Sequence, residues 1–417
     1  MRILYLNTTI QCGGAEQVVS QLLQGMEKRG HKVYQISCYD TKHLKLPANI
    51  CVLYRSFCMR MLNRLLTGNH GNKNLYIWYS RQYICAFIKK YKIDVVHFHN
   101  LHDNFLGIRD IARIAGLRPT VWTLHDFWAL TGHCASPYGC DGEKWKKGCG
   151  SCSCLGNYPA LRNDVSHQLF QEKQKAFRMS GITFTVPSGW LLQQFQQSHL
   201  QGLPCEQVYN SLDTALWHPL DGRQIRKKYG IPEGEKVIGF IAADPEKKLK
   251  GMSYVLEALH QLPDPKQYLL LIAGKEGKVL EGLKETFRVR HLGYLSAREA
   301  LKEFYTLADV LINPSVYDTF GLTNIEAMAC GTPVIAFPVC AMPEIIDESC
   351  GWIAEEVSGD ALAKTICQAF SDPESLEEKK KGSRRRAEWV FSEEKMLDRF
   401  EEIYQKKAAE GRNEHED

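Results

Sequence analysis

Short apolar segments alternate with helical patterns along almost the entire chain. The segments are mostly apolar rather than strictly alternating between apolar and polar residues, as expected for strands that are buried on both faces. Strands that alternate with helices predict an α/β fold built on parallel sheets. The expected strands are residues 3–6, 33–37, 95–98, 120–124 and 182–186 in a first series, and residues 237–242, 268–273, 290–293, 310–313 and 333–337 in a second.

The rhythm breaks near residues 200–220, where Gly202, Pro204 and Pro219 fall. A length of 417 residues suits two such domains. The expected architecture is two Rossmann-like, doubly wound domains, residues 1–202 and 203–384, that face each other across a cleft. Residues 385–417 are expected to form a helix that returns to the first domain, followed by a charged tail. The segment from Ser375 to His415 predicts one long helix whose Lys and Arg runs are solvated.

The composition is that of a globular enzyme, with 24% charged residues and 44% hydrophobic residues. No apolar run approaches the roughly 18–20 residues that cross a bilayer. The first residues are interpreted as a strand rather than a signal peptide, which favours a cytoplasmic protein. The fifteen cysteines are therefore expected to be mostly reduced.

The net charge of +4 conceals an uneven distribution, because no Asp or Glu occurs between Asp40 and Asp94. A basic stretch rich in aromatic and leucine residues predicts association with an anionic inner membrane surface. The alternative is a basic face that attracts only an anionic acceptor. No nucleic-acid partner is expected. The basic residues of this stretch are Lys42, Lys45, Arg55, Arg60, Arg64, Lys73, Arg81, Lys89, Lys90 and Lys92.

Ligands of doubly wound domains bind at the carboxyl ends of the strands, so the residues after each strand are the candidate site residues. Gly13 and Gly14 follow the first strand and open a helix, whose N-terminus could face an anion. The alternative is a tight turn without a ligand. The dinucleotide fingerprint G-x-G-x-x-G is absent here, which argues against an NAD enzyme.

Several histidines follow neighbouring strands of the first series. A period of two places His97 and His99 on one face of their strand, and His102 lies just beyond. One or two of these are expected to be hydrogen-bonded and structural, and the others to face solvent. His125, directly after the strand at 120–124 and before an insertion, is the preferred functional candidate.

That insertion, residues 133–159, is rich in cysteine. The pattern Cys134-x5-Cys140-x8-Cys149-x2-Cys152 favours a structural zinc site that would order a segment with little core of its own. Disulfides or free thiols are the alternatives.

In the second series, a basic loop and an acidic segment follow two strands. Lys247, Lys248 and Lys250 precede Gly251 and could neutralise a diphosphate, or form a solvated loop. Asp318 lies in the loop after residues 310–313, and Glu326 lies on the helix that is expected to start near Gly321. Carboxylates there can accept hydrogen bonds from sugar or ribose hydroxyls, and the backbone N–H groups of residues 321–323 can face a phosphate.

These motifs, with the AlaMetAlaCysGlyThrProValIle segment at 327–335, resemble in order those of the retaining glycosyltransferases of family 4, which have the GT-B fold. The cysteine-rich insertion is similar to that of a bacterial surface-polysaccharide subgroup. The resemblance implies catalytic roles for His125 at the transferred sugar, Lys250 at the diphosphate and Asp318 at the donor sugar. It implies donor binding by Glu326 at the ribose and by Gly13, Gly14, Lys248, Gly293, Tyr294, Phe320, Gly321, Leu322 and Thr323.

The implied reaction transfers a sugar from a nucleoside-diphosphate sugar, with retention, to a hydroxyl of a glycan such as capsule, exopolysaccharide or lipopolysaccharide. The acceptor is expected to be linked to polyprenyl diphosphate, and no catalytic metal is expected. A GT-B epimerase, a phosphorylase or a catalytically weakened glycan-binding protein are alternatives. Two departures from the family pattern are Asp318 in place of Glu and a missing Arg in the region of Asp244.

Overall fold

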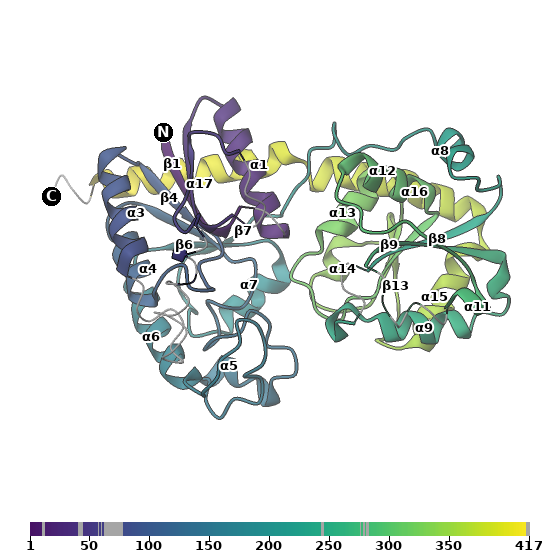
Figure 1. Cartoon of the computed structure of the whole chain (residues 1–417), viewed down its shortest axis with the longest axis horizontal. Helices are drawn as coiled ribbons and strands as arrows, with labels where there is room; N and C mark the ends of the chain where they lie inside the picture. The colour runs from purple at the N-terminus through teal and green to yellow at the C-terminus, as the bar shows by residue number, and fades with distance from the viewer. Residues whose placement is uncertain are drawn as a thin grey trace. The chain divides into compact units, whose positions relative to one another are not determined.

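The computed structural model describes residues 1–10, 13–40, 45–56, 58–59, 61, 78–242, 246–275, 277, 280 and 283–413. Asp244 and four residues of the basic stretch (Lys42, Arg60, Arg64 and Lys73) lie outside the described residues. The chain divides into two compact units, one of Met1–Tyr209 with Met396–Asp417 and one of Asn210–Lys395 (Figure 1). For comparison, the sequence places the two boundaries after residues 202 and 384.

The N-terminal unit contains a parallel sheet of seven strands in the order β3-β2-β1-β4-β5-β6-β7. Its register pairs Ile3 of β1 with Val33 on one side and with Val95 on the other. The strands are β1 (Arg2–Thr9), β2 (Lys32–Tyr39), β3 (Ile50–Val52), β4 (Val95–Phe98), β5 (Thr120–Thr123), β6 (Thr183–Val186) and β7 (Cys205–Gln207).

Helices cover both faces of this sheet. The apolar side chains of α1 and α17 pack against Ile3, Tyr5 and Val121 on one face. On the other face the Trp122 ring meets Phe177 of α6 edge-on. The helices of this unit are α1 (Gly14–Lys28), α3 (Trp78–Lys90), α4 (Ile108–Ala115), η1 (Asp141–Glu143), α5 (Lys144–Lys147), α6 (Ser166–Arg178), α7 (Gly189–Gln196) and most of α17 (Glu393–Asn413).

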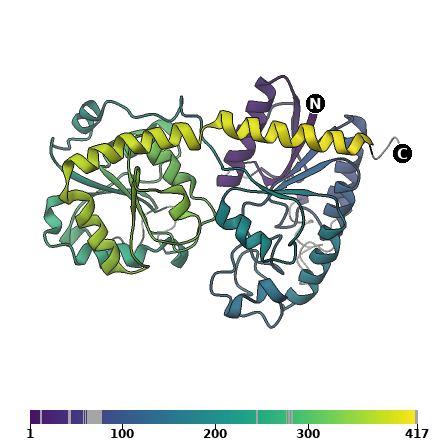
Figure 2. The ribbon, with the colours of Figure 1, turned by 180° about the vertical axis from the view of Figure 1, so that it is seen from behind.

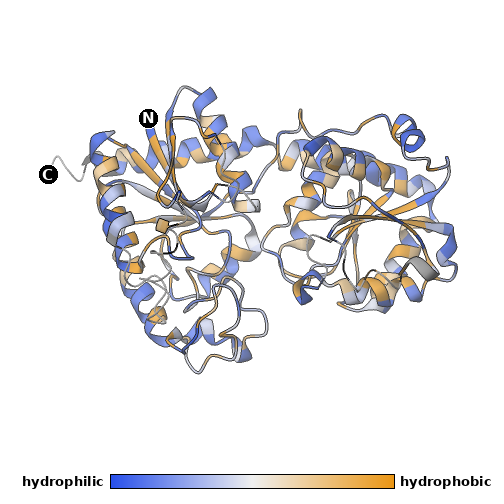
Figure 3. Cartoon of the chain, viewed as in Figure 1, coloured by the Kyte–Doolittle hydropathy of each residue, from blue (hydrophilic) through white to orange (hydrophobic). Residues whose placement is uncertain are grey.

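The C-terminal unit contains a parallel sheet of six strands in the order β10-β9-β8-β11-β12-β13. All seven residues of β9 are buried, which explains its uninterrupted apolar sequence. The apolar colouring of the strands in each unit is visible in Figure 3. The strands are β8 (Lys236–Ala242), β9 (Tyr268–Gly274), β10 (Arg288–His291), β11 (Val310–Asn313), β12 (Val334–Ala336) and β13 (Gly351–Ile353).

Figure 1 shows α9, α11 and α15 on one face of this sheet and α12, α13 and α16 on the other. The main core cluster joins side chains of α9 and α15 to β8, β9 and β11. The helices are α8 (Gly222–Lys228), η2 (Lys248–Lys250), α9 (Met252–His260), η3 (Pro265–Gln267), α11 (Leu283–Thr286), α12 (Arg298–Leu307), α13 (Leu322–Ala329), α14 (Met342–Ile345), α15 (Gly359–Ser371) and α16 (Pro373–Val390).

The prediction of one long C-terminal helix is wrong. The helix breaks after Val390, and α17 begins at Glu393, as the ribbon in Figure 2 shows. The buried Phe391 leaves the helical conformation at φ −111° and ψ 22°, and Ser392 pairs with Leu212. A backbone hydrogen bond from Glu393 N to Leu212 O, 3.0 Å long, then holds the interruption.

The arginine run of α16 is also not simply solvated. Arg384 donates to the carbonyls of Thr214, Trp217 and Ala329, and Arg386 donates to the carbonyls of Glu344 and Ile345. These arginines therefore bind carbonyl groups of the loop at 214–217 and of the last turns of α13 and α14. None of the helices among the described residues has the length and apolar character needed to cross a bilayer.

Candidate active site

The C-terminal unit has its topological switch point at β8 and β11. From β8 the strand order proceeds to β9 and β10 in one direction, and from β11 it proceeds to β12 and β13 in the other. Loops that leave the carboxyl ends of two such strands diverge, and ligands of doubly wound folds bind at this point. Lys250 follows β8 and Asp318 follows β11, so two of the predicted catalytic residues lie at the switch point.

The two loops are fastened to each other through their backbones. Val316 N donates to Leu249 O at 3.0 Å. Gly251 adopts φ +63°, and a Cβ atom built on it would lie 1.9 Å from Pro314 O. Only glycine meets both conditions, because the left-handed conformation and the close backbone approach each disfavour a side chain. The sequence Lys250-Gly251 therefore brings Lys250 beside the loop after β11.

Lys250 and Asp318 form an open ion pair, with Lys250 Nζ 3.8 Å from Asp318 Oδ2. The Lys250 side chain is 46% exposed and the Asp318 side chain 25% exposed. An exposed pair at this distance contributes little stability, and an incoming anion can replace the carboxylate without much cost. Lys248 is exposed on the same turn.

Asp318 also shapes the entrance to α13. Its Oδ1 atom accepts a hydrogen bond from Phe320 N at 3.2 Å, and the buried Phe320 ring lies edge-on to Phe391. Gly321 follows with φ +84° and is the N-cap of α13, without a side-chain cap. The first turn of α13, with Leu322 and Thr323, therefore begins beside the Asp318 carboxylate, close to Lys250.

Glu326 lies one turn into α13 and is 7% exposed. Its Oε2 atom accepts a hydrogen bond from Tyr305 Oη on α12 at 3.0 Å. Burial and the neighbouring carboxylate hold the pKa of Tyr305 well above its usual range, so the phenol remains a donor. Tyr305 is a positioning residue that the sequence pattern did not reveal, because it lies 21 positions from Glu326 on another helix.

The predicted donor-binding pair Gly293 and Tyr294 follows β10, at the same carboxyl edge but on the outermost strand of the sheet. Gly274 N donates to Gly293 O at 2.8 Å, which joins the end of β9 to this turn. Tyr294 is 68% exposed. Its ring is thus available for stacking against a planar ligand.

The N-terminal unit has its own switch point at β1 and β4. Gly13 is the N-cap of α1, in extended conformation and without a side-chain cap. A Cβ atom on Gly13 would lie 2.7 Å from Glu16 Oε2, and the same carboxylate accepts hydrogen bonds from Thr9 and Asn7. The start of α1 at Gly14 is therefore already next to a held carboxylate, which any bound phosphate would have to accommodate.

The histidines that follow β4 and β5 form one buried network. The rings of His97 and His99 are in contact, with their centroids 4.2 Å apart and their planes tilted by 36°, which confirms that they share a face. His97 hydrogen-bonds Tyr404 and Thr123, at 2.6 and 2.7 Å, and His99 Nδ1 lies 2.9 Å from His125 Nε2.

The expectation that some of these histidines face solvent is wrong. His97, His99 and His102 are 0%, 1% and 4% exposed. The strand ends lie inside the unit beneath the turn that follows β5, and Asp126 of that turn accepts from His102 Nε2 at 2.9 Å. Only His125, of the four, is partly exposed.

Two family models together match almost the whole chain. The model described as Glycosyltransferase Family 4 matches residues 12–216, and the model described as Glycosyl transferases group 1 matches residues 221–386. The chain belongs to the family 4 glycosyltransferases. It is 28% identical over 438 residues to the putative colanic acid biosynthesis glycosyl transferase WcaC of Escherichia coli K12, covering 97% of this chain and 100% of WcaC.

Solved structures of glycosyltransferases share the fold of this one. Sucrose-phosphate synthase from Thermosynechococcus elongatus aligns over 97% of this chain and 98% of its own, with a TM-score of 0.72 and 18% identity. Anabaena HepE in complex with UDP-glucose aligns over 97% of this chain and 100% of its own, with a TM-score of 0.63 and 16% identity. The two parallel, doubly wound sheets are therefore those of a GT-B glycosyltransferase.

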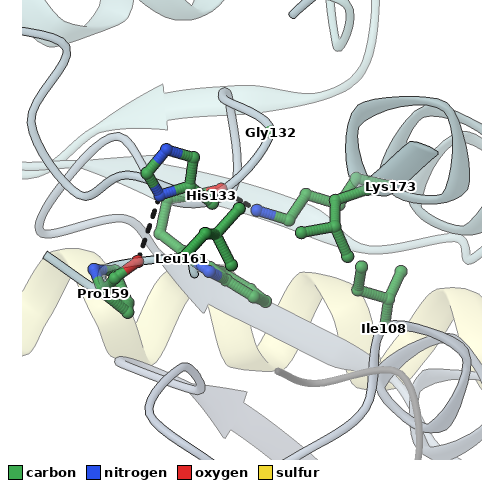
Figure 4. A pocket seen from close by; sticks show the side chains of 8 residues that line it. Ile108, Gly132, His133, Pro159, Leu161 and Lys173 are labelled. Carbon is green, nitrogen blue, oxygen red and sulfur yellow. Dashed lines mark hydrogen bonds between the residues drawn. The ribbon is translucent and has the colours of Figure 1, made fainter. Parts of the chain in front are cut away.

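Lys173 of α6 is buried against the residues that precede the cysteine-rich insertion of this glycosyltransferase. The Lys173 ammonium donates to the carbonyls of Trp128 and Thr131 and lies 3.7 Å from the centre of the Trp128 ring. Figure 4 shows Lys173 and His133 lining a small pocket, where His133 bonds the carbonyl of Pro159. Its volume of about 10 Å³ is at the lower limit for one water molecule, so no sugar fits there.

The four predicted zinc ligands of the insertion differ in burial and in their neighbours. Burial raises the pKa of Cys134 to about 12 and that of Cys149 to about 11, so both are neutral thiols near pH 7. The Cys152 Sγ atom lies 3.6 Å from His133 Nε2, and Cys140 is only partly buried. Within the part of the chain that the structure describes, no three His, Cys, Asp or Glu side chains are arranged to hold a metal ion. Zinc binding stays a prediction.

The described part of the basic stretch includes α3 and the turn after it. Lys45, Arg55, Lys89, Lys90 and Lys92 are exposed, whereas Arg81 pairs with Asp110 at 3.0 Å. The large hydrophobic residues that are exposed in this stretch are Met59, Met61, Tyr79, Tyr83 and Tyr91. The described part of this surface thus combines exposed cations with aromatic and thioether side chains.

Proposed function

We propose that this glycosyltransferase transfers a sugar from a nucleoside-diphosphate sugar to a hydroxyl of a cell-surface glycan, with retention of the anomeric configuration. The observation that carries the proposal is the Lys250–Asp318 pair beside the first turn of α13, at the switch point of the C-terminal unit. The similarity to WcaC supports the glycan, and the fold shared with HepE, which binds UDP-glucose, supports the donor.

The chemistry follows from the charges at this edge. When the bond from the anomeric carbon to the phosphate oxygen breaks, its electron pair remains on that oxygen and the diphosphate gains negative charge. The Lys250 ammonium and the N–H groups at the start of α13 stabilise this charge, because both are positive before the reaction begins. Lys250 exchanges its open pairing with Asp318 for the phosphate.

The other groups are proposed to act as the family resemblance implies. Glu326, held by Tyr305, accepts hydrogen bonds from the ribose hydroxyls, and Tyr294 stacks on the base. Asp318 faces the donor sugar, and His125 of the N-terminal unit contacts the transferred sugar. The acceptor hydroxyl attacks the anomeric carbon on the face that the diphosphate leaves, and the departing phosphate oxygen takes the hydroxyl proton.

The transfer experiment combines the purified chain with a panel of nucleoside-diphosphate sugars and glycan acceptors, and assigns the anomeric configuration of the product by NMR. The proposal expects a new glycosidic bond with the configuration of the donor. A product with the opposite anomeric configuration would contradict the proposal. So would consumption of the donor that yields neither a glycoside nor the free sugar.

We also propose a lipid-linked acceptor at an anionic membrane, which the exposed basic and aromatic side chains among the described residues of the basic stretch, 45–56 and 78–92, support. Each exposed cation near such a surface contributes about 1 kcal/mol of attraction, and exposed aromatic rings favour the interface. Co-sedimentation should therefore require anionic vesicles and weaken with salt. The double variant Lys89→Glu/Lys90→Glu should lose binding, whereas Lys266→Glu/Lys364→Glu in the C-terminal unit should retain it. Equal binding by the two variants would refute this proposal.

A further inference from the structure

Two neighbouring imidazoles in the N-terminal unit share one hydrogen bond. His99 Nδ1 and His125 Nε2 are 2.9 Å apart, and the rings stack with their centroids 5.2 Å apart and their planes 16° from parallel. Burial lowers the pKa of His125 to about 4 and holds that of His99 well below its usual range, so both are neutral near pH 7. Each ring thus carries a single proton, and one of the two facing nitrogens must donate.

The environment of His99 decides which nitrogen donates. His99 Nε2 is buried and has no hydrogen-bond partner among the described residues. If His99 carried its proton on Nε2, a buried N–H would be left without an acceptor. Buried N–H groups are almost always paired, whereas acceptors are left under-satisfied somewhat more often. The proton of His99 therefore belongs on Nδ1, where it is donated to His125 Nε2.

The same bond fixes the proton of His125. Its Nε2 lone pair is occupied as the acceptor for His99, so its own proton lies on Nδ1. In this state the Nε2 lone pair of His125 is occupied by the His99 N–H, so this atom cannot remove a proton from the acceptor.

We propose that His99 is a positioning residue that holds His125 as its Nδ1–H tautomer, so that His125 acts on the transferred sugar as a hydrogen-bond donor and not as a base. This rests on the proposed contact between His125 and the sugar. The inference fits a reaction in which the departing phosphate, rather than a side chain, takes the acceptor proton.

His99 itself is held in place by groups that do not touch His125. Its backbone carbonyl accepts from Trp122 Nε1 at 2.9 Å, and its ring lies 6.1 Å from that of Tyr5 and 4.2 Å from that of His97. His97 is fastened by Tyr404 and Thr123. A ring that is packed on this side cannot turn freely, and the direction of its Nδ1–H is set.

The first test reads the protons directly. Long-range ¹H–¹⁵N spectra of the full chain labelled with ¹⁵N-histidine, with His125 assigned through His125→Leu, should show the Nδ1–H tautomer of His125 near pH 7. An Nε2–H tautomer of His125 in the wild-type chain would overturn the inference without any reference to activity.

The second test uses two variants of His99. Asn places a side-chain N–H near the position of imidazole Nδ1 and should preserve both the tautomer and the turnover. Leu removes the donor and should lower kcat by about 10–100-fold, as loss of an outer hydrogen-bond partner typically does, with a smaller effect on the donor KM. Equal kcat values for His99→Asn and His99→Leu would overturn the inference.

His199→Asn is the matched control, since it alters another buried histidine of the N-terminal unit and leaves the rings of His97, His99 and His125 in place, so it should keep the His125 tautomer. Melting temperatures of all variants separate misfolding from loss of positioning. If His125→Leu retains full turnover, the proposed role of His125 fails, while the wild-type spectrum still decides the tautomer.

Discussion

Gly251 offers the sharpest test of how the Lys250 loop is built. It shares a left-handed backbone conformation with Gly230, at φ +63° and +59°, but only Gly251 has a neighbour where a Cβ atom would go. That neighbour is Pro314 O, at 1.9 Å, on the chain that leaves β11. Gly230 has nothing within 4 Å of such an atom. Replacing each glycine by alanine therefore separates backbone strain from the collision.

The magnitudes follow from these contacts. The left-handed conformation costs alanine about 1–2 kcal/mol, and this cost is common to both variants. In Gly251→Ala, the Cβ atom and Pro314 O must also move apart by about 1.5 Å to reach ordinary contact, and overpacking of this kind costs typically about 1–3 kcal/mol. Gly251→Ala should therefore lose about 2–5 kcal/mol, against about 1–2 kcal/mol for Gly230→Ala.

The assay compares urea unfolding of the two variants with donor turnover. Because the two units can unfold separately, hydrogen exchange of the peptides that cover β8 and β11 reports on the affected sheet. Gly251→Ala should also lower kcat/KM, since the collision displaces the turn that carries Lys250, and Gly230→Ala should not. Equal losses of stability and unchanged kcat/KM in both variants would refute the reasoning about this loop.

Three further predictions concern other parts of the molecule. The folded-state pKa of about 4 for His125 and for His199 lies below the ordinary value of 6.5, so the unfolded chain takes up protons first as the pH falls. Each group therefore contributes stability above pH 6.5 that is lost progressively toward pH 4, and by pH 5 the loss in unfolding free energy is about 2 kcal/mol per group. A melting temperature that does not fall between pH 7 and pH 5 would contradict this. Tyr305→Phe removes the hydroxyl that donates a hydrogen bond to Glu326, so it should raise the KM for the sugar nucleotide and lower the stability of the C-terminal unit by about 1–3 kcal/mol. Tyr254→Phe should change neither quantity. An unchanged KM in Tyr305→Phe would remove Tyr305 from the site. Metal analysis of the purified chain should find one zinc per chain that is lost in Cys149→Ser/Cys152→Ser but kept in Cys367→Ser, and a chain without zinc would show that the insertion is ordered by its own packing.

Strands buried on both faces were predictable from the sequence. Residues 95–98 and 310–313 are β4 and β11 at the expected bounds, because these short apolar runs have no alternative helical period. The strands β3, β7 and β13 were missed, because each has three residues, is largely half-buried and forms only against a strand already in place. The break between α16 and α17 was missed because no Gly or Pro marks it; a tertiary contact of Phe391 and Ser392 with the chain near Leu212 produces it.

The candidate site divides in the same way. Lys250 and Asp318 could be found from the sequence because they lie in the loops after two predicted strands and belong to a family motif. Tyr305 and His99 could not be recognised as positioning residues, since their roles depend on which side chain lies across from them in space, 21 and 26 positions away along the chain. The burial of His97, His99 and His102 likewise could not be predicted, because it depends on the turn after β5 that covers the strand ends.

The central claim is that Lys250 binds and stabilises the diphosphate at the switch point of the C-terminal unit. Isothermal titration of a nucleoside diphosphate into the wild-type chain, Lys250→Ala and Lys266→Ala tests it most directly, because Lys266 lies at the opposite, amino end of β9. Lys250→Ala should weaken binding at least about tenfold, which is about 1.4 kcal/mol, while Lys266→Ala should bind like the wild type. Wild-type affinity in Lys250→Ala would contradict it.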